Sequence, residues 1–185
     1  MKSTLNIFLI WIFYILLHIV SGKRGFDIVM ESLKCTADPK YIGKNDCFID
    51  KSIKQGKANA DLEFIHEIPT LTYSLTIDAL RGNSEHFTLI NLQNADGCAF
   101  LEGKLDGNLV KIYRETLIQG GNFPIKCPIV KDYHLELKNI VVDVEKFPPY
   151  LPEAKFVIKA QVKMEKVLFL EIELNGTVVQ KRKIG

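Results

Sequence analysis

Alternation of apolar and polar side chains dominates this chain and predicts β-strands. Leu71, Tyr73, Leu75 and Ile77 are separated by polar residues, which is the pattern of a strand with one buried face and one solvated face. Strands are predicted at residues 26–31, 60–68, 71–78, 87–92, 133–144, 156–164 and 167–174. About seven strands at this spacing predict an all-β fold, an immunoglobulin-like antiparallel β-sandwich.

One segment, around residues 98–118, has helical periodicity instead. Its apolar side chains recur at spacings of three and four, Asp96 is a candidate N-cap, and Gly120-Gly121 is a candidate stop. We expect a helical insertion that is interrupted near Gly107-Asn108 and packs its apolar stripe against the sandwich.

The first 22 residues have the features of a secretory signal peptide. Lys2 is followed by the apolar run 7–17, and Val20-Ser21-Gly22 supplies small residues for cleavage. The alternative is a membrane anchor, but the stretch 5–20 contains only 16 residues, fewer than the roughly 20 that a spanning helix needs. We therefore predict a signal peptide at 1–22, a secreted, extracellular protein, and a single domain at 23–185.

All four cysteines lie after this leader. An even number of cysteines in an oxidising compartment favours two disulfides, for which three pairings are formally open. We favour neighbouring partners, which close short loops. The intervening gaps of 11, 50 and 28 residues contain no Cys-x-x-Cys, so neither zinc nor another metal is expected. The favoured disulfides are Cys35 with Cys47 and Cys98 with Cys127.

Charge and motifs exclude several classes of function. The chain has 24 Lys and Arg against 22 Asp and Glu, so it has no strongly basic character and nucleic acid is not an expected partner. His66, His86 and His134 lack the spacing of metal ligands, and no Gly-x-Ser-x-Gly motif is present. We expect no enzymatic activity and no cofactor.

Two motifs carry a resemblance to known proteins. The stretch from Asp96 to Leu101 contains Asp-Gly-Cys-Ala-Phe-Leu, and the stretch from Asn122 to Pro128 reads Asn-Phe-Pro-Ile-Lys-Cys-Pro. The second motif, with Pro148-Pro149-Tyr150-Leu151-Pro152, resembles the ML lipid-recognition superfamily. Both motifs are more closely similar to a large insect family of secreted proteins related to the chemosensory B-type proteins. The resemblance covers most of residues 26–175.

This resemblance implies a function in binding. In the ML superfamily two antiparallel sheets splay apart around an apolar cleft, so the expected ligand is a lipid, a sterol or a hydrocarbon semiochemical. The implied protein is a secreted carrier or presenter in chemosensation, with a cell-surface receptor as a further partner. The alternative is an extracellular protein–protein interaction module with a closed core and no ligand.

The candidate ligand-binding residues are apolar and aromatic side chains on expected inner faces or at the mouth of the cleft. A sandwich of this size also needs an aromatic core, so each of them has a purely structural alternative. They are Phe64, Tyr73, Phe87, Phe123, Tyr133, Leu151, Phe156 and Ile158.

Asn175-Gly176-Thr177 is a glycosylation sequon. Export would permit a glycan on Asn175, while Asn-Gly between two apolar runs is equally typical of a hairpin turn. Both interpretations place residue 175 at the surface.

Overall fold

The computed structural model describes residues 24–82 and 85–181. The predicted signal peptide, residues 1–22, therefore lies outside the described residues. In chain order the elements are β1 (Phe26–Ala37), β2 (Ile42–Asp50), β3 (Lys57–Phe64), β4 (Thr72–Arg81), β5 (Glu85–Asp96), α2 (Gly97–Glu102), α3 (Asn108–Gln119), β6 (Tyr133–Ile140), the 3-10 turn η1 (Val144–Lys146), β7 (Ala154–Met164) and β8 (Val167–Gln180).

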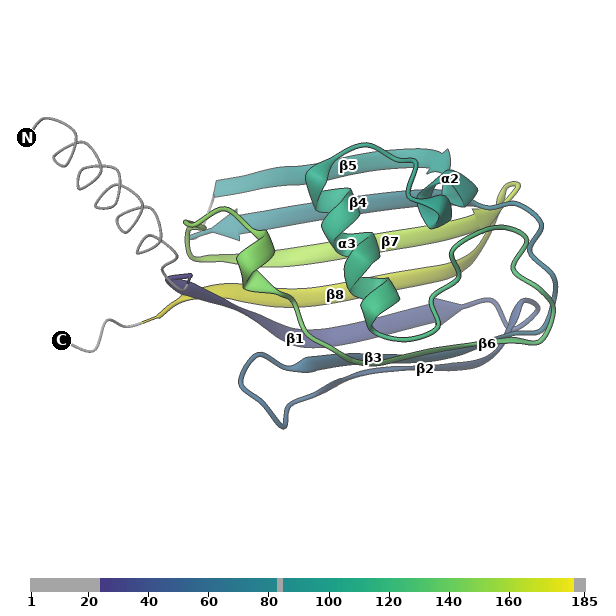
Figure 1. The fold of residues 1–185 in the computed structure, drawn as a ribbon, viewed down its shortest axis with the longest axis horizontal. Helices are drawn as coiled ribbons and strands as arrows, with labels where there is room; N and C mark the ends of the chain where they lie inside the picture. The colour runs from purple at the N-terminus through teal and green to yellow at the C-terminus, as the bar shows by residue number, and fades with distance from the viewer. Residues whose placement is uncertain (1–23, 83–84, 182–185) are drawn as a thin grey trace, which may run out of the picture.

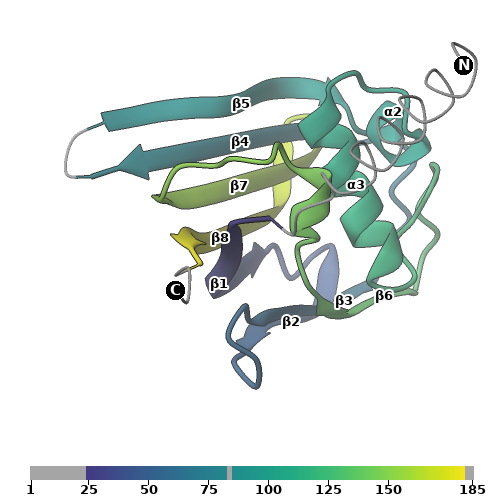
Figure 2. The same ribbon diagram turned by 60° about the vertical axis from the view of Figure 1, so that its left-hand side comes forward.

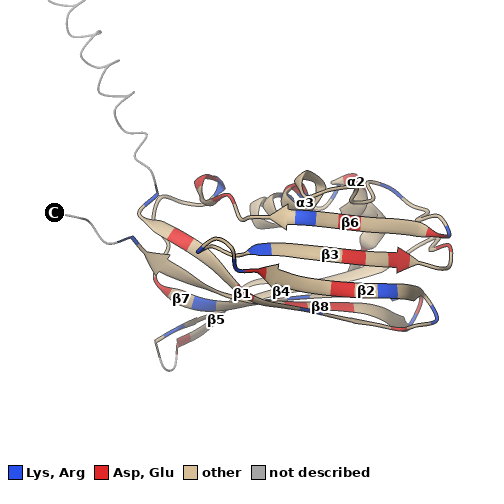
Figure 3. Ribbon diagram, turned by 90° about the horizontal axis from the view of Figure 1, so that it is seen from below, with Lys and Arg blue, Asp and Glu red and all other residues tan. Residues whose placement is uncertain are grey.

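The strands form two antiparallel sheets that face each other (Figure 1). The larger sheet has five strands in the order β1-β8-β7-β4-β5, and the smaller has three in the order β2-β3-β6. Charged residues of both signs occur along β2, β3 and β6 of the smaller sheet (Figure 3). The predicted fold class, an all-β antiparallel sandwich with a helical insertion around residues 98–118, is confirmed.

The main core lies between the two sheets. Leu62 and Phe64 of the smaller sheet and Leu75 and Phe169 of the larger are all 3% exposed or less. A second, smaller cluster surrounds Phe26 near one end of the larger sheet. Each sheet thus buries one face and keeps the other in water, as the alternating pattern requires.

Two disulfides are present, in the pairing that the sequence favours. Cys35 with Cys47 joins β1 to β2 and therefore joins the two sheets, with 5.8 Å between the Cα atoms. Cys98 with Cys127 joins the start of α2 to the segment before β6, with 5.5 Å between the Cα atoms. The sheets are thus linked directly along one edge and through α2 on the other side.

One strand escaped the sequence analysis. The described residues form eight strands, and the additional one is β2. Its sequence, Ile-Gly-Lys-Asn-Asp-Cys-Phe-Ile-Asp, shows little alternation because only Ile42 is fully buried. β2 is an edge strand, and β3 is its one neighbour in the sheet. Backbone pairing with β3, and not burial of an apolar face, therefore holds β2 in place.

The predicted hairpin turn at Asn175-Gly176 is wrong. Both residues lie inside β8, where Gly176 is opposite Phe156 of β7. A Cβ at Gly176 would lie 2.3 Å from the Phe156 ring, so this glycine makes room for the ring. The Asn175 Nδ2 donates to Ser32 Oγ and Glu173 Oε1, both at 3.2 Å. Glycosylation of Asn175 stays a prediction.

Candidate functional site

Two short helices cover part of the inner surface of the larger sheet. Figures 1 and 2 show α2 and α3 on the same side of that sheet as β6, with α3 beside the edge that β6 forms. α2 contacts β4 and β5, and α3 contacts β6. The helices therefore bridge the free edges of the two sheets.

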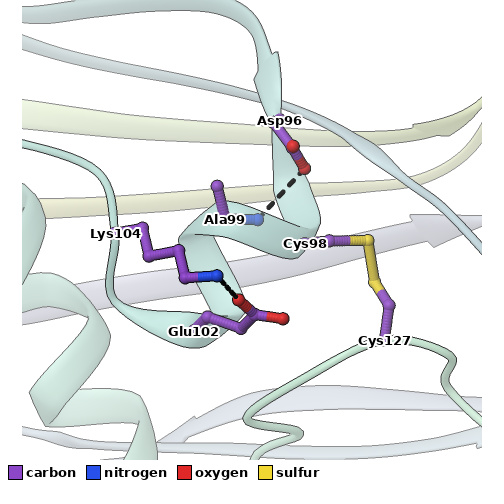
Figure 4. The surroundings of a disulfide bond; sticks show 6 residues. All are labelled: Asp96, Cys98, Ala99, Glu102, Lys104 and Cys127. Carbon is purple, nitrogen blue, oxygen red and sulfur yellow. Dashed lines mark hydrogen bonds and ion pairs between the residues drawn. A yellow bond between two sulfur atoms is a disulfide. The ribbon is translucent and has the colours of Figure 1, made fainter.

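α2 is capped at both ends and packed closely on β4. The Asp96 carboxylate accepts a hydrogen bond from the Ala99 N–H at 3.0 Å (Figure 4). At the other end, Gly103 adopts the left-handed conformation with φ 76°. Gly97 donates its N–H to the Leu71 carbonyl at 2.9 Å, and a Cβ there would meet Leu71. The predicted interruption of the helix is confirmed, although it begins at Gly103 and ends at Gly107.

α3 is held at its middle and after its end. From the middle of the helix, the Arg114 guanidinium donates to the Leu101 carbonyl of α2, from Nε at 2.9 Å and from Nη2 at 2.5 Å. After its end, the Gly121 backbone pairs with Leu137 of β6, and Gly120 accepts the Lys138 N–H at 2.8 Å. Its inward stripe, Val110, Tyr113 and Leu117, packs against the main core, which follows the helical spacing in the sequence.

An apolar cavity of about 90 Å³ lies between the sheets and the two helices. Every side chain that lines it is uncharged, and the only polar atoms among these side chains are two tyrosine hydroxyls. The lining residues are Ala60, Leu62, Phe64, Leu71, Tyr73, Phe100, Leu101, Tyr113, Leu117, Phe123, Pro124, Ile129, Leu135, Leu137, Ala160, Val162, Phe169, Leu170 and Ile172.

Phe100 of α2 is the centre of the aromatic side chains at this cavity. It stacks on Tyr73 of β4, with ring centroids 4.4 Å apart and an interplanar angle of 15°. The ring of Tyr113 lies 6.2 Å away, and that of Phe123 lies 6.3 Å away, edge to face. Such contacts add to the stabilisation from buried area.

The Tyr73 side chain has an unusual polar environment. The residue is 4% exposed, and its hydroxyl has no hydrogen-bond partner among the described residues. Burial raises the pKa of Tyr73 well above its usual range, and the nearby Tyr113 phenol raises it further. Burial also raises the pKa of Tyr113. The two hydroxyls thus lie close enough to influence each other's pKa, and both tyrosines stay neutral at physiological pH.

A second hollow, of about 140 Å³, lies between α2 and α3. Phe100 borders both spaces, but here charged side chains, Lys111, Arg114 and Glu115, contribute to the lining. Its mixed lining makes it a poorer site for an apolar ligand than the cavity between the sheets.

The candidate residues from the sequence are distributed over several parts of the molecule. Phe64, Tyr73 and Phe123 line the cavity. Tyr133 lies beside Phe64, with ring centroids 6.3 Å apart, and its hydroxyl donates to the Asn122 carbonyl. The residue remains at the border of the core and outside the lining.

The other four candidates lie elsewhere. Leu151 and Phe156 pack in the smaller cluster around Phe26. Ile158 borders the main core, and Phe87 is half-buried on the edge strand β5. Residues that the site prediction omitted, Phe100, Leu101, Tyr113 and Leu117, belong to the helical stripe, which was the signal that could have identified them.

Within residues 24–82 and 85–181, no group of three or more His, Cys, Asp or Glu side chains is arranged to hold a metal ion. In the same part of the chain, no helix is long and apolar enough to span a membrane.

Comparison with solved structures finds a similarity to a chicken protein, in a structure titled "Crystal structure of chicken MD-1 complexed with lipid IVa". The sequences are 15% identical, the match covers 85% of this chain and 99% of that chain, and the TM-score is 0.33. Among curated proteins, none matches this chain. Residues 71–158, which include α2, α3 and both cavity tyrosines, match the model of a family described as "Protein of unknown function (DUF1091)".

Proposed function

We propose that this protein is a secreted, non-enzymatic carrier that holds a small apolar ligand between its sheets, beneath α2 and α3. The observation that carries this proposal is the cavity lining, which contains no charged side chain. Ligand sites are typically concave and mostly apolar, with few polar groups. Phe64, Tyr73 and Phe123 are the residues predicted from the sequence that we retain as ligand contacts.

The cavity must expand when the ligand enters. Its volume of about 90 Å³ is well below the roughly 300 Å³ at which ligand pockets begin. α3 is the element that we expect to move, because Val110 is its only fully buried residue and Gly107 provides no side-chain cap. Its C-terminal end is paired to β6, so we expect the N-terminal part to move outwards.

The sequence resemblance extends this proposal to the ligand class and the setting. We propose a lipid, sterol or hydrocarbon semiochemical as ligand, a role in chemosensation, and delivery to a cell-surface receptor. Removal of residues 1–22 during export is part of the same proposal, and two disulfides support an oxidising destination. N-terminal sequencing of protein from culture medium would test it, since an intact leader would contradict cleavage.

The small volume of the cavity favours a second function. A dry, closed sandwich would act as an extracellular protein–protein interaction module without a ligand. The two functions differ in one measurable property, which is whether the folded protein takes up an apolar molecule.

Organic extraction of the purified protein, followed by mass spectrometry, tests the carrier function. A fluorescent fatty acid and a fluorescent sterol provide uptake assays on the extracted protein. Ala160→Leu fills the cavity and should abolish uptake. Ala154→Leu, on the same strand and face but outside the lining, is the matched control and should retain it. Absence of both a co-purified ligand and uptake would contradict the carrier function and favour the interaction module.

A further inference from the structure

The Tyr73 hydroxyl is a buried polar group that the fold itself leaves unsatisfied. Tyr73 is 4% exposed, lines the cavity, and finds no hydrogen-bond partner among residues 24–82 and 85–181. Buried hydroxyl groups normally have a partner, because losing water without replacement costs free energy. Stacking on Phe100, at 4.4 Å, does not satisfy the hydroxyl.

A second tyrosine lines the same cavity from another element. Tyr113 belongs to α3, whereas Tyr73 belongs to β4. The rings of both residues are neighbours of Phe100, at 6.2 Å and 4.4 Å respectively. Two neutral tyrosines from different elements thus lie near each other beside a cavity whose other lining side chains are all apolar.

The lining also restricts the charge of a ligand. No Lys, Arg or His lines the cavity, and neither does any Asp or Glu. An ionised head group would therefore be buried without a counter-charge, which is far more costly than burying a neutral oxygen that accepts a hydrogen bond. A neutral hydroxyl, carbonyl or ester oxygen is the group that this environment suits.

We propose that Tyr73, assisted by Tyr113, binds the single neutral oxygen of an otherwise apolar ligand. The ligand class is therefore an alcohol, a ketone or an ester rather than a plain hydrocarbon or a fatty-acid anion. This inference rests on the proposed carrier function. It assigns Tyr73 to ligand recognition in addition to its packing on Phe100.

Competition binding with a matched set of probes tests the inference. The probes are decan-1-ol, decane, methyl decanoate and decanoate at pH 8, each displacing N-phenyl-1-naphthylamine from the full-length mature protein. Tyr73→Phe should lower the affinity for decan-1-ol roughly 3- to 10-fold, which is the range of one neutral hydrogen bond. The affinity for decane should stay unchanged. Tyr113→Phe should have a smaller effect in the same direction. Methyl decanoate should bind at least about tenfold more tightly than decanoate.

Tyr41→Phe is the matched control, because Tyr41 packs on Phe169 outside the cavity lining. Tyr41→Phe should change the affinity for neither decan-1-ol nor decane. Tyr73→Phe should also melt no lower than wild type, because it removes an unsatisfied hydroxyl and keeps the ring. An equal effect of Tyr73→Phe on decan-1-ol and decane would overturn the inference while leaving the carrier function intact. Failure of all four probes to bind to wild type would overturn both.

Discussion

Phe100 lies nearly parallel to Tyr73, with their ring centroids 4.4 Å apart and an interplanar angle of 15°. The stack connects α2 to β4, and the hydrogen bond from Gly97 to Leu71 joins α2 to the residue that precedes β4. Because Phe100 contacts Tyr113 and Phe123 as well, it links the helical insertion to the sandwich.

Phe100→Ala should therefore be strongly destabilising. Phe100 is 3% exposed, and truncation of a buried phenylalanine costs about 3 to 5 kcal/mol. Urea unfolding should show this loss in the free energy of unfolding. Phe48→Ala is the control, since Phe48 is 49% exposed and should cost about 0.5 kcal/mol or less. Equal losses in the two variants would contradict the central position of Phe100.

Replacing each disulfide by a serine pair should lower stability unequally. The partners are 29 residues apart for Cys98 and Cys127 and 12 apart for Cys35 and Cys47. Loss of a native disulfide costs about 2 to 5 kcal/mol of stability. Because the 98–127 disulfide closes the longer loop, loop entropy makes its loss about 0.8 kcal/mol more costly. Urea unfolding of the two double variants measures the loss of unfolding free energy for each disulfide. A smaller loss for the 98–127 pair would show that loop length does not determine the order.

Gly121→Ala should disrupt the junction between α3 and β6. A Cβ at this position would lie 2.0 Å from the Glu136 carbonyl oxygen, which belongs to the backbone and cannot rotate away. We expect a loss of about 2 kcal/mol or more, measured by thermal unfolding. Gly25→Ala is the control, because no atom lies within 4 Å of its added Cβ and its stability should be nearly unchanged. Similar melting temperatures for the two variants would contradict the close approach at Gly121.

Asp61 should contribute to the loss of stability in acid. Hydrogen bonds from Lys44, at 2.5 Å, and from His134, at 2.6 Å, lower the pKa of Asp61 below its ordinary value of 3.8. Because the pKa of Asp61 is lower in the folded protein, its ionised carboxylate stabilises the fold above about pH 4. This stabilisation is lost as the pH falls below that value. The contribution is small, because the three side chains are accessible to solvent and salt.

Asp61→Asn should reduce the difference in unfolding free energy between pH 7 and pH 2.5, measured in urea at low salt. Glu153→Gln removes an exposed carboxylate before β7 and should leave that difference unchanged. The effect of Asp61→Asn should shrink in 0.5 M NaCl. An unaltered pH dependence in Asp61→Asn would contradict the contribution of Asp61.

The strands with a clear alternation were predictable, and β2 was not. Along β4, the apolar positions Tyr73, Leu75 and Ala79 are buried because that face meets the core. Along β2, most side chains are exposed, and its position as an edge strand is set by pairing with β3. The Asn175-Gly176 prediction failed for a related reason, since Gly176 is required by the ring of Phe156, a contact between strands that no local pattern reveals.

The sequence by itself determined the alternating strands, the helical insertion and the favoured pairing of the four cysteines, because these depend on local periodicity and chain separation. Only the tertiary structure decided which inward residues border the cavity. Tyr73 and Phe156 both lie on inward strand faces, yet Tyr73 meets Phe100 of α2, whereas Phe156 packs over Gly176. What lies opposite an inward side chain depends on how the two sheets and the insertion pack, and periodicity along one strand contains no information on that.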